Sequence, residues 1–368
     1  MKTHNPSNER IKRQYFDFLK EAKQQSEASV DAVAKAFARF EAETRHRDFK
    51  TFNHQQAVAF KRNLAQRDSQ VTGGKLSKAT QYATLNSLKA FFQWLATQPG
   101  FRSHVQYTDA AYFNLSDNDS RIATARRPRP APTLEQVKHT LAQMPATTDI
   151  ERRDRALVAF ALLTGARDAA LASLKLKHVD LAAGSVHQDA RDVETKFAKT
   201  FTTVFFPVGD EVRQIVDDWV NYLRHDKLWG NDDALFPKTA VGIGPSQHFE
   251  ATGLLREHWS TATPIRTVFK LAFQRAGLPY FNPHSFRSTL VMLGEARCKS
   301  AEEFKAWSQN LGHEGVLTTF YSYGTVAPNR QAEIIKTVGA AVDEPAGHEL
   351  EWARKMVRVM REAGMSVP

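Results

Sequence analysis

A stretch rich in arginine and proline, residues 121–132, divides this 368-residue sequence into two parts. It holds four arginines and three prolines, in the order Arg121-Ile-Ala-Thr-Ala-Arg-Arg-Pro-Arg-Pro-Ala-Pro132. Proline fixes φ and lacks a backbone N–H, so it interrupts helices and is excluded from central strands. It also stiffens a segment into an extended form. We therefore predict an extended interdomain linker here, between a first domain, residues 1–120, and a second domain, residues 133–368.

The first domain carries the period of amphipathic helices. Apolar side chains recur at one-turn spacing from Arg10 to about Thr97, which predicts helices that each bury one face. Ser77 is a candidate N-cap for the last of them, because a serine hydroxyl accepts a backbone N–H of the first helical turn. We predict that this domain is helical throughout.

The second domain mixes helices with short strands. Thr133-Leu-Glu-Gln136 fits a capping box at its start, and the apolar segment from Asp154 to Leu163 predicts a buried helix. Three short segments rich in β-branched and aromatic residues follow, at 178–181, 184–189 and 201–207. We therefore predict a mainly α fold with a small antiparallel sheet (α+β).

The balance of charge favours an anionic partner. Lys and Arg number 50 against 40 Asp and Glu, which gives a formal net charge of +10. Such a balance is typical of proteins that bind polyanions, although other basic proteins share it. The four arginines of the linker would suit a segment that lies along a DNA backbone. A solubilising linker also accounts for them.

Cysteine and histidine usage argue against disulfides and metal clusters. Cys298 is the single cysteine, so no intramolecular disulfide can form, and a reducing cytosol is the natural setting. None of the 13 histidines stands in a His-x-x-x-His or His-Glu-x-x-His pattern, so no metal site is predicted. No apolar run reaches the length of a membrane span, and the N-terminus lacks a signal-peptide core. We predict a cytoplasmic protein without a membrane segment.

The chemistry of the second domain centres on Asn282-Pro-His-Ser-Phe-Arg287 and on Leu311-Gly-His313 after it. His284 and Arg287 lie one helical turn apart, so both can reach the same phosphate. The planar, permanently charged guanidinium matches phosphate oxygens, and histidine can relay a proton near neutral pH. An isolated His-x-x-Arg is more often a solvated helix face. The second histidine and the tyrosines that follow it turn the pair into a predicted site for phosphoryl transfer.

Four motifs in order resemble the tyrosine recombinase (phage integrase) family: Thr164-Gly-Ala-Arg167, His284-x-x-Arg287, Leu311-Gly-His313 and a tyrosine close behind. The resemblance covers about residues 133–330. The helical domain with a basic linker ahead of it looks like the core-binding domain of that family. The resemblance implies site-specific cutting and rejoining of DNA through a covalent 3′-phosphotyrosine, with no metal and no other cofactor.

The resemblance also implies a role for each matching residue. Arg167 and Arg287 would clamp the non-bridging oxygens of the scissile phosphate and stabilise the charge that develops on them. His284 and His313 would complete this cradle and assist proton transfer with the nucleophile.

Two supporting positions leave alternatives open. In this family a lysine on the hairpin between two strands protonates the leaving 5′ oxygen. Lys199 fits the pattern of the strand that follows it, and Lys196 is the alternative. Many members carry an acidic residue three positions after the first arginine, where this sequence has Ala170. Either Asp168 substitutes for it or the role is absent.

The nucleophile departs from the family pattern. It usually lies nine positions after the histidine of Leu-Gly-His, where this sequence has Ser322, flanked by Tyr321 and Tyr323. Residues two apart on a helix point about 200° away from each other, so only one tyrosine can face the phosphate. Tyr321 belongs to a helical stripe with Leu317, Phe320 and Gly324, which is typical of core packing. We therefore predict Tyr323 as the nucleophile, with Tyr321 as the alternative.

The resemblance implies partners as well. They are double-stranded DNA at a specific site and a homo-tetramer on two duplexes, in a protein of the nucleoid that serves a mobile genetic element. It leaves open whether accessory DNA-bending proteins take part. Helices are predicted at 330–338 and 349–362, and one of them either docks into a neighbouring subunit, as in that family, or packs on its own domain.

Two other functions fit the same fold. One is a DNA-binding protein that has lost cleavage, which the displaced tyrosine favours and the retained arginines and histidines oppose. The other is a type IB topoisomerase-like enzyme, which uses similar groups. The two-domain size and Leu311-Gly-His313 argue against that reading.

Overall fold

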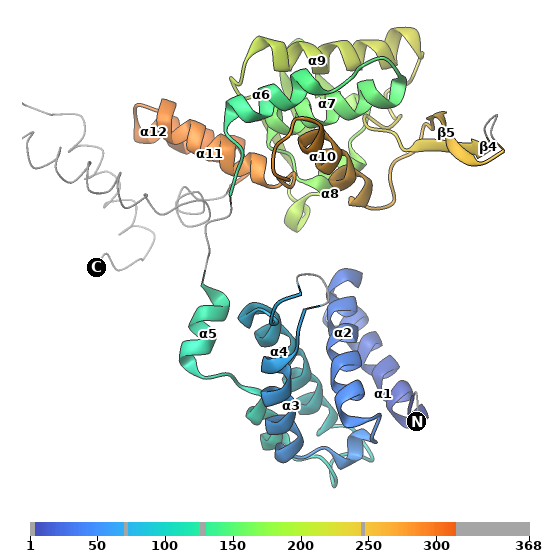
Figure 1. Ribbon diagram of the computed structural model, residues 1–368, viewed down its shortest axis with the longest axis vertical. Helices are drawn as coiled ribbons and strands as arrows, with labels where there is room; N and C mark the ends of the chain where they lie inside the picture. The colour runs from blue at the N-terminus through green and yellow to red at the C-terminus, as the bar shows by residue number, and fades with distance from the viewer. Residues whose placement is uncertain (1–3, 70–72, 126–129, 244–246, 314–368) are drawn as a thin grey trace, which may run out of the picture. The chain divides into compact units, whose positions relative to one another are not determined.

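The computed structural model describes residues 4–69, 73–125, 130–243 and 247–313, and the chain divides into two compact units, residues 1–127 and 128–368. The described part is mainly helical with two small antiparallel sheets, which confirms the predicted fold class (Figure 1). No helix within these four ranges is long and apolar enough to cross a membrane. The helices predicted at 330–338 and 349–362 lie outside the described residues.

Unit 1 is a set of helices around an aromatic core. Its helices are α1 (Pro6–Asp17), which continues as a π-helical turn (Phe18–Ala22), α2 (Glu27–Thr44), α3 (His54–Gln66), α4 (Lys78–Leu95) and α5 (Asp117–Thr124), with 3₁₀ turns at Phe49–Thr51 and Tyr107–Phe113. Phe92 of α4 stacks on Phe52 with 3.6 Å between ring centroids and meets Phe40 of α2 edge-on at 5.3 Å. Ser77 caps α4 as predicted, since its side chain accepts the N–H of Thr80.

The structure corrects the start of the predicted linker, because residues 121–124 are helical. They belong to α5, which begins after Ser116, and the Ser116 side chain accepts the N–H of Asp119. Asp117 and Asp119 add negative charge at the helix N-terminus, where the helix dipole favours it. No residue of α5 is buried, and Ile122 and Ala123 are its only apolar residues, so the sequence carries no apolar stripe that could reveal this helix. The prediction of an extended segment is therefore wrong for residues 121–124.

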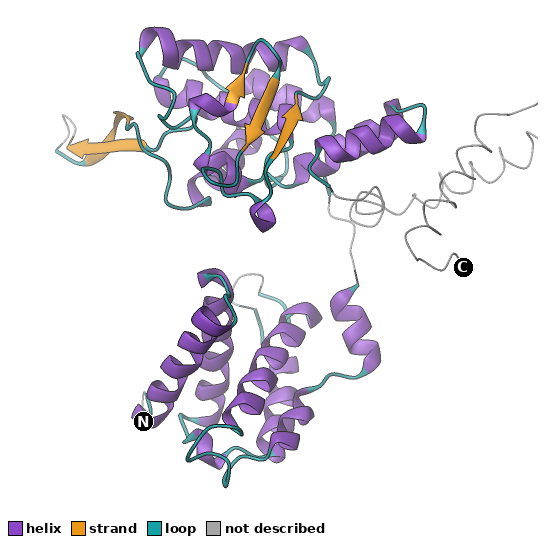
Figure 2. Ribbon diagram, turned by 180° about the vertical axis from the view of Figure 1, so that it is seen from behind, coloured by secondary structure: helices purple, strands orange, loops and turns teal. Residues whose placement is uncertain are grey.

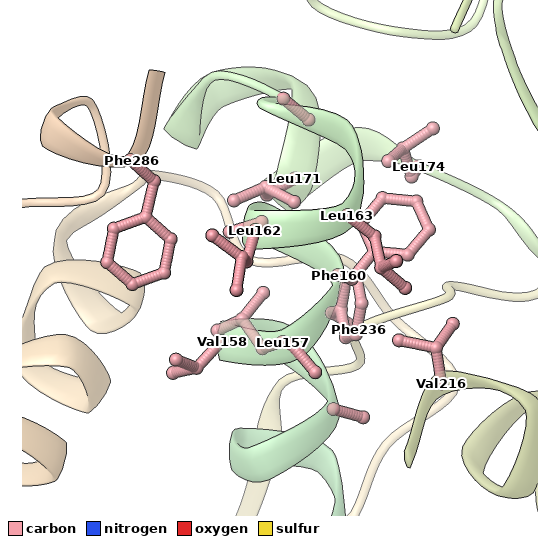
Figure 3. Close-up of a cluster of buried hydrophobic side chains, with 14 of the residues drawn as sticks. Leu157, Val158, Phe160, Leu162, Leu163, Leu171, Leu174, Val216, Phe236 and Phe286 are labelled. Carbon is pink, nitrogen blue, oxygen red and sulfur yellow. The ribbon is translucent and has the colours of Figure 1, made fainter. Parts of the chain in front are cut away.

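Unit 2 is built around α7 (Asp149–Thr164), which is buried on all sides from Ala156 onwards. In Figure 3 its side chains pack against those of the elements that surround it, among them Leu171 of α8 (Asp168–Ser173), Val216 of α9 (Asp210–Asn221) and Phe286 of α11 (Ser285–Arg297). A helix that is apolar all round is stable only in an interior. α7 begins five residues before the predicted Asp154, because Thr148 and Glu151 form a capping box there.

The described part of unit 2 contains three further helices: α6 (Leu134–Gln143), α10 (Thr263–Arg275) and α12 (Ala301–Asn310). α6 begins with the predicted capping box, in which the Thr133 and Gln136 side chains each bond to the other residue's backbone N–H. After α9 the chain makes a π-helical turn, Tyr222–Asp226.

The predicted antiparallel sheet is present in unit 2 (Figure 2). It consists of β1 (Val179–Asp180), β2 (Ser185–Gln188) and β3 (Phe201–Val204), in the order β1-β2-β3. Val186 pairs with Thr203, and β3 forms an edge of the sheet. The connection from β2 to β3 contains a 3₁₀ turn, Lys196–Ala198.

A second hairpin was not predicted. Its strands are β4 (Thr239–Ile243) and β5 (Phe249–Leu254), and it extends away from the body of unit 2 (Figure 1). Ile243 pairs with Phe249, and these side chains are 71% and 81% exposed. Its strands contain Gly242 and Gly253, which are typical of loops, so the short alternation of apolar residues along them did not indicate a hairpin.

Gly294 lets α11 approach α12 closely. A Cβ placed on Gly294 would lie 2.7 Å from Cδ1 and Nε1 of the Trp307 indole. The indole is held in place because its Nε1 donates to the Leu290 carbonyl at 2.8 Å.

We expect Gly294→Ala to destabilise unit 2 by about 1 kcal/mol. Alanine favours a helix over glycine by about 1 kcal/mol, but overpacking costs about 1–3 kcal/mol, and a fixed indole leaves little room for relaxation. Urea unfolding of the full chain measures the change. Combining Gly294→Ala with Trp307→Phe should cost less than the sum of the two single changes. A higher unfolding midpoint for Gly294→Ala would contradict the close packing.

Candidate active site

The turn after α7 sets the position of Arg167. α7 ends at Gly165, whose φ of 59° lies in the left-handed region. A Cβ on Gly165 would lie 2.8 Å from Cδ2 of Leu311 and 3.1 Å from Cδ1 of Leu290. Conformation and close packing therefore both require glycine here. Two residues on, Arg167 is the N-cap of α8 and is half-buried.

Arg287 of α11 joins this turn to the end of α12. Its side chain is 2% exposed, and its Nη1 donates to the Gly165 carbonyl at 2.7 Å. Its Nη2 donates to the Leu311 carbonyl at 2.6 Å. A buried guanidinium is tolerated only when its N–H groups are hydrogen-bonded. Arg287 thus ties together two of the predicted motifs, Thr164-Gly-Ala-Arg167 and Leu311-Gly-His313.

His284 stands immediately before α11, which begins one residue later at Ser285. The Asn282 side chain caps this turn, because its Oδ1 accepts the Ser285 N–H at 3.1 Å. Pro283 lies within the same turn, two residues before α11 begins. His284 itself is exposed, whereas Arg287 one turn later is buried.

His313 is a neutral imidazole at pH 7. It is 7% exposed, and its Nε2 lies 2.9 Å from Nη2 of Arg287. A guanidinium only donates, so Nε2 accepts and the imidazole proton sits on Nδ1. Burial lowers the pKa of His313, and the neighbouring positive charges, of which Arg287 is the strongest, act in the same direction, so that together they bring this pKa to about 3.

Four of the predicted site residues gather around a fifth, His313. The positive charges of Arg287, Arg167, His284 and Lys199 all lie close enough to lower its pKa. They come from the turn after α7, the start of α11 and the connection between β2 and β3. Within the described ranges, no group of three or more His, Cys, Asp or Glu side chains could hold a metal ion. The cluster is a concentration of positive charge, which suits an anionic substrate.

The two candidate lysines differ in their surroundings. Lys199 is half-buried and lies two residues before β3. Lys196 is exposed, and its ammonium lies over the Phe197 ring, 4.7 Å from the centroid. Tyr321 and Tyr323 lie outside the described residues, so the choice of nucleophile stays a prediction.

The connection that carries Lys199 is anchored on the β2 side by an ion cluster that the sequence did not predict. The Asp192 carboxylate binds Lys175 and Lys177, each at 2.8 Å. Their hydrogen bonds hold the pKa of Asp192 far below its usual range. Lysines and aspartates at these spacings resemble any solvated surface, so only the fold reveals the cluster.

Asp168 follows Arg167 directly and binds α10. Its Oδ2 accepts from Nε of Arg266 at 2.9 Å and from Nη2 at 2.6 Å. Arg266 is 57% exposed, so this pair contributes little to stability, on the order of 0–1 kcal/mol. Ala170 is packed in the core. The question whether Asp168 takes over the acidic role stays open to experiment.

A comparison with family models decides the family. The model described as the phage integrase family matches residues 133–329, which is more than half of the 368 residues. The chain belongs to the phage integrase family. This confirms the resemblance seen in the four motifs. The match runs from the capping box of α6 through every element that carries a site residue.

Individual relatives of this phage integrase family member are distant. Tyrosine recombinase XerC 2 of Ralstonia nicotianae is 30% identical over 108 residues, which is 29% of this chain and 28% of that protein. The chain therefore spans well under a third of that relative's length. A lambda integrase dimer bound to a COC′ core site has a TM-score of 0.58 at 13% identity, over 86% of this chain and 95% of that one.

The Tn1549 transposon integrase in complex with a circular intermediate DNA has a TM-score of 0.55 at 13% identity, over 89% of this chain and 99% of that one. At such low identity, these two structures show that the fold is shared.

We expect the imidazole of His313 to make folding stability depend on pH. An unfolded histidine binds a proton near pH 6.5, whereas the pKa of folded His313 is about 3. Between these values the unfolded state binds more protons, so stability is lost as pH falls below about 6.5. Urea midpoints of the wild type should therefore fall more steeply between pH 6.5 and pH 4.5 than those of His313→Gln.

The same change at exposed His225, His225→Gln, is the matched control for the loss of an imidazole. Equal slopes for the wild type and His313→Gln would show that His313 is protonated in the folded state as readily as in the unfolded state.

Proposed function

We propose that this member of the phage integrase family is a site-specific DNA recombinase, which cuts and rejoins double-stranded DNA through a covalent 3′-phosphotyrosine. One observation carries the proposal: Arg167, Arg287, His284 and Lys199 gather around the buried, neutral His313. A protein that only binds DNA needs cationic groups along a groove, not two guanidinium groups and two imidazoles around one point.

The reaction begins when the tyrosine oxygen attacks the scissile phosphorus. Arg167 and Arg287 bind the non-bridging oxygens and stabilise the negative charge that builds on them in the transition state. His313, with its proton on Nδ1, donates a hydrogen bond without adding charge, and His284 assists removal of the phenolic proton. Lys199 gives a proton to the leaving 5′ oxygen. Rejoining reverses each transfer, as a 5′ hydroxyl attacks the phosphotyrosine.

Tyrosine needs this surrounding charge. The pKa of an unperturbed phenol is about 10, so at neutral pH the hydroxyl is a poor nucleophile. Positive charges within a few ångströms stabilise the phenolate and lower that barrier. The same charges offset the phosphates of the DNA brought alongside.

The assembly is part of the proposal. The lambda integrase relative is a dimer bound to a COC′ core site, and the Tn1549 transposon integrase is in complex with a circular intermediate DNA. We propose that this chain likewise acts on DNA of a mobile genetic element, as a homo-tetramer on two duplexes within the nucleoid.

We expect Tyr323→Phe to abolish a covalent protein–DNA adduct and Tyr321→Phe to retain it. The substrate is a duplex recovered by binding selection from a randomised pool and nicked beside the cleavage point, so that the released strand diffuses away. A denaturing gel detects the adduct. Loss only with Tyr321→Phe would exchange the two roles. No adduct from the wild type on a verified site would favour a DNA-binding protein without cleavage, which the displaced tyrosine also fits.

We expect Lys199→Ala to slow adduct formation by about 10²- to 10⁴-fold, which is the usual loss when a general acid is removed. Lys196→Ala is its matched partner, because it removes the same charge from the same connection at an exposed position. Single-turnover rates on the nicked duplex measure both. Should Lys196→Ala show the larger loss, the assignment of the two lysines is reversed.

A further inference from the structure

The last residue of α12, Asn310, is bonded along the outer edge of β3. Its Nδ2 donates to the Val204 carbonyl at 2.8 Å, and its Oδ1 accepts the Val204 N–H at 2.8 Å. Its own carbonyl accepts the Thr203 hydroxyl at 3.0 Å. One residue on α12 therefore makes three hydrogen bonds to two successive residues of the strand.

The side-chain amide takes the place of a further strand. β3 pairs with β2 along one edge, and no strand among the described residues pairs with its other edge. A primary amide offers one donor face and one acceptor face, so it matches both the N–H and the C=O of Val204. Aspartate lacks the donor and alanine lacks both groups. Both bonds to Val204 therefore require the side-chain amide of Asn310.

A second contact continues the attachment beyond Asn310. A Cβ on Gly312, at φ 73°, would lie 2.8 Å from Cε2 and Cζ of the Phe201 ring. The turn that leads into His313 is thus packed on the first residue of β3, while Asn310 is bonded to its last residue. The strand that leads away from Lys199 and the turn that leads into His313 are held against each other along the whole of β3.

We propose that Asn310 is a positioning residue, which holds β3, the strand that follows Lys199, in register with the turn that leads into His313. The proposal rests on the proposed function, in which Lys199 protonates the leaving 5′ oxygen. Arg287 holds His313 and the Leu311 carbonyl by separate bonds, so that side of the site does not depend on Asn310. Removing the Asn310 amide should therefore impair the lysine's task and leave the arginine and histidine cradle in place.

Changing the leaving atom of the substrate tests whether Asn310 acts on the lysine and not on the arginine and histidine cradle. Sulfur in place of the 5′ bridging oxygen leaves as a thiolate, and because a thiol is a far stronger acid than an alcohol, it needs no proton from a lysine. We expect Asn310→Ala to slow single-turnover cleavage of the oxygen substrate by about 10- to 100-fold, since small misplacements of a catalytic group have costs of this order. Cleavage of the sulfur substrate should fall by less than about 3-fold, the pattern also expected for Lys199→Ala.

Three further variants serve as a control, a comparison and a milder change. Gln309→Ala, an exposed neighbour on the same helix, should cleave both substrates as the wild type does. His313→Ala should slow both substrates, because its role does not concern the leaving atom. Thr203→Val removes only the hydroxyl bond to the Asn310 carbonyl and nearly conserves volume. Thr203→Val should slow cleavage of the oxygen substrate less than Asn310→Ala does, and should again leave cleavage of the sulfur substrate nearly unchanged. This variant keeps the test informative if Asn310→Ala folds poorly.

The outcomes are distinct. Equal slowing of both substrates by Asn310→Ala, or no slowing of either, overturns the positioning role. A wild type that forms no adduct with either substrate overturns the proposed function itself, and the positioning role with it.

Discussion

The active-site region depends on one buried guanidinium. Arg287 bonds to the Gly165 carbonyl, the Leu311 carbonyl and Nε2 of His313. Each of these three partners is neutral, so they satisfy N–H groups and compensate for lost hydration without cancelling the positive charge. A carboxylate in their place would form a stronger pair with Arg287, but it would also neutralise the positive charge that attracts an incoming phosphate. The same bonds that stabilise the fold here preserve the charge that the proposed reaction uses.

The rest of unit 2 serves to bring distant segments to this guanidinium. α7 is buried on every side near its end, so Gly165 emerges from the centre of the core and not from its surface. α11 supplies Arg287 from the same core, and Gly294 allows α12 to pack close beside it. Such a site cannot shift one residue without disturbing the packing around the others, because protein interiors are close-packed.

Several helix ends, turns and site motifs of unit 2 could be predicted from the sequence, because short stretches of neighbouring residues specify them. The capping box at Thr133, the turn at Gly165 and the helix start at Asn282 each follow from residues within a few positions of one another. The site motifs were found because each needs particular residue types at short spacing. The capping box of Thr148 and Glu151 is equally local, and it places the start of α7 at Asp149.

The features that were missed share a different cause. α5 has only two apolar residues, Ile122 and Ala123, so no apolar stripe indicates it, and the alternation along β4 and β5 is short and interrupted by Gly242 and Gly253. Asn310 is an ordinary polar residue at a helix end until β3, more than a hundred positions earlier, is placed beside it. Contacts between segments so far apart depend on the topology of the whole unit, which periodicity does not reveal.

The low basicity of His313 has a consequence for how such a site behaves in a living cell. Its titration lies near pH 3, and guanidinium groups keep their proton throughout the physiological range. The electrostatic field that Arg167, Arg287 and His313 together present is therefore constant under swings in intracellular acidity. The proposed strand cleavage would therefore run on chemistry that changes in pH do not modulate through these three groups.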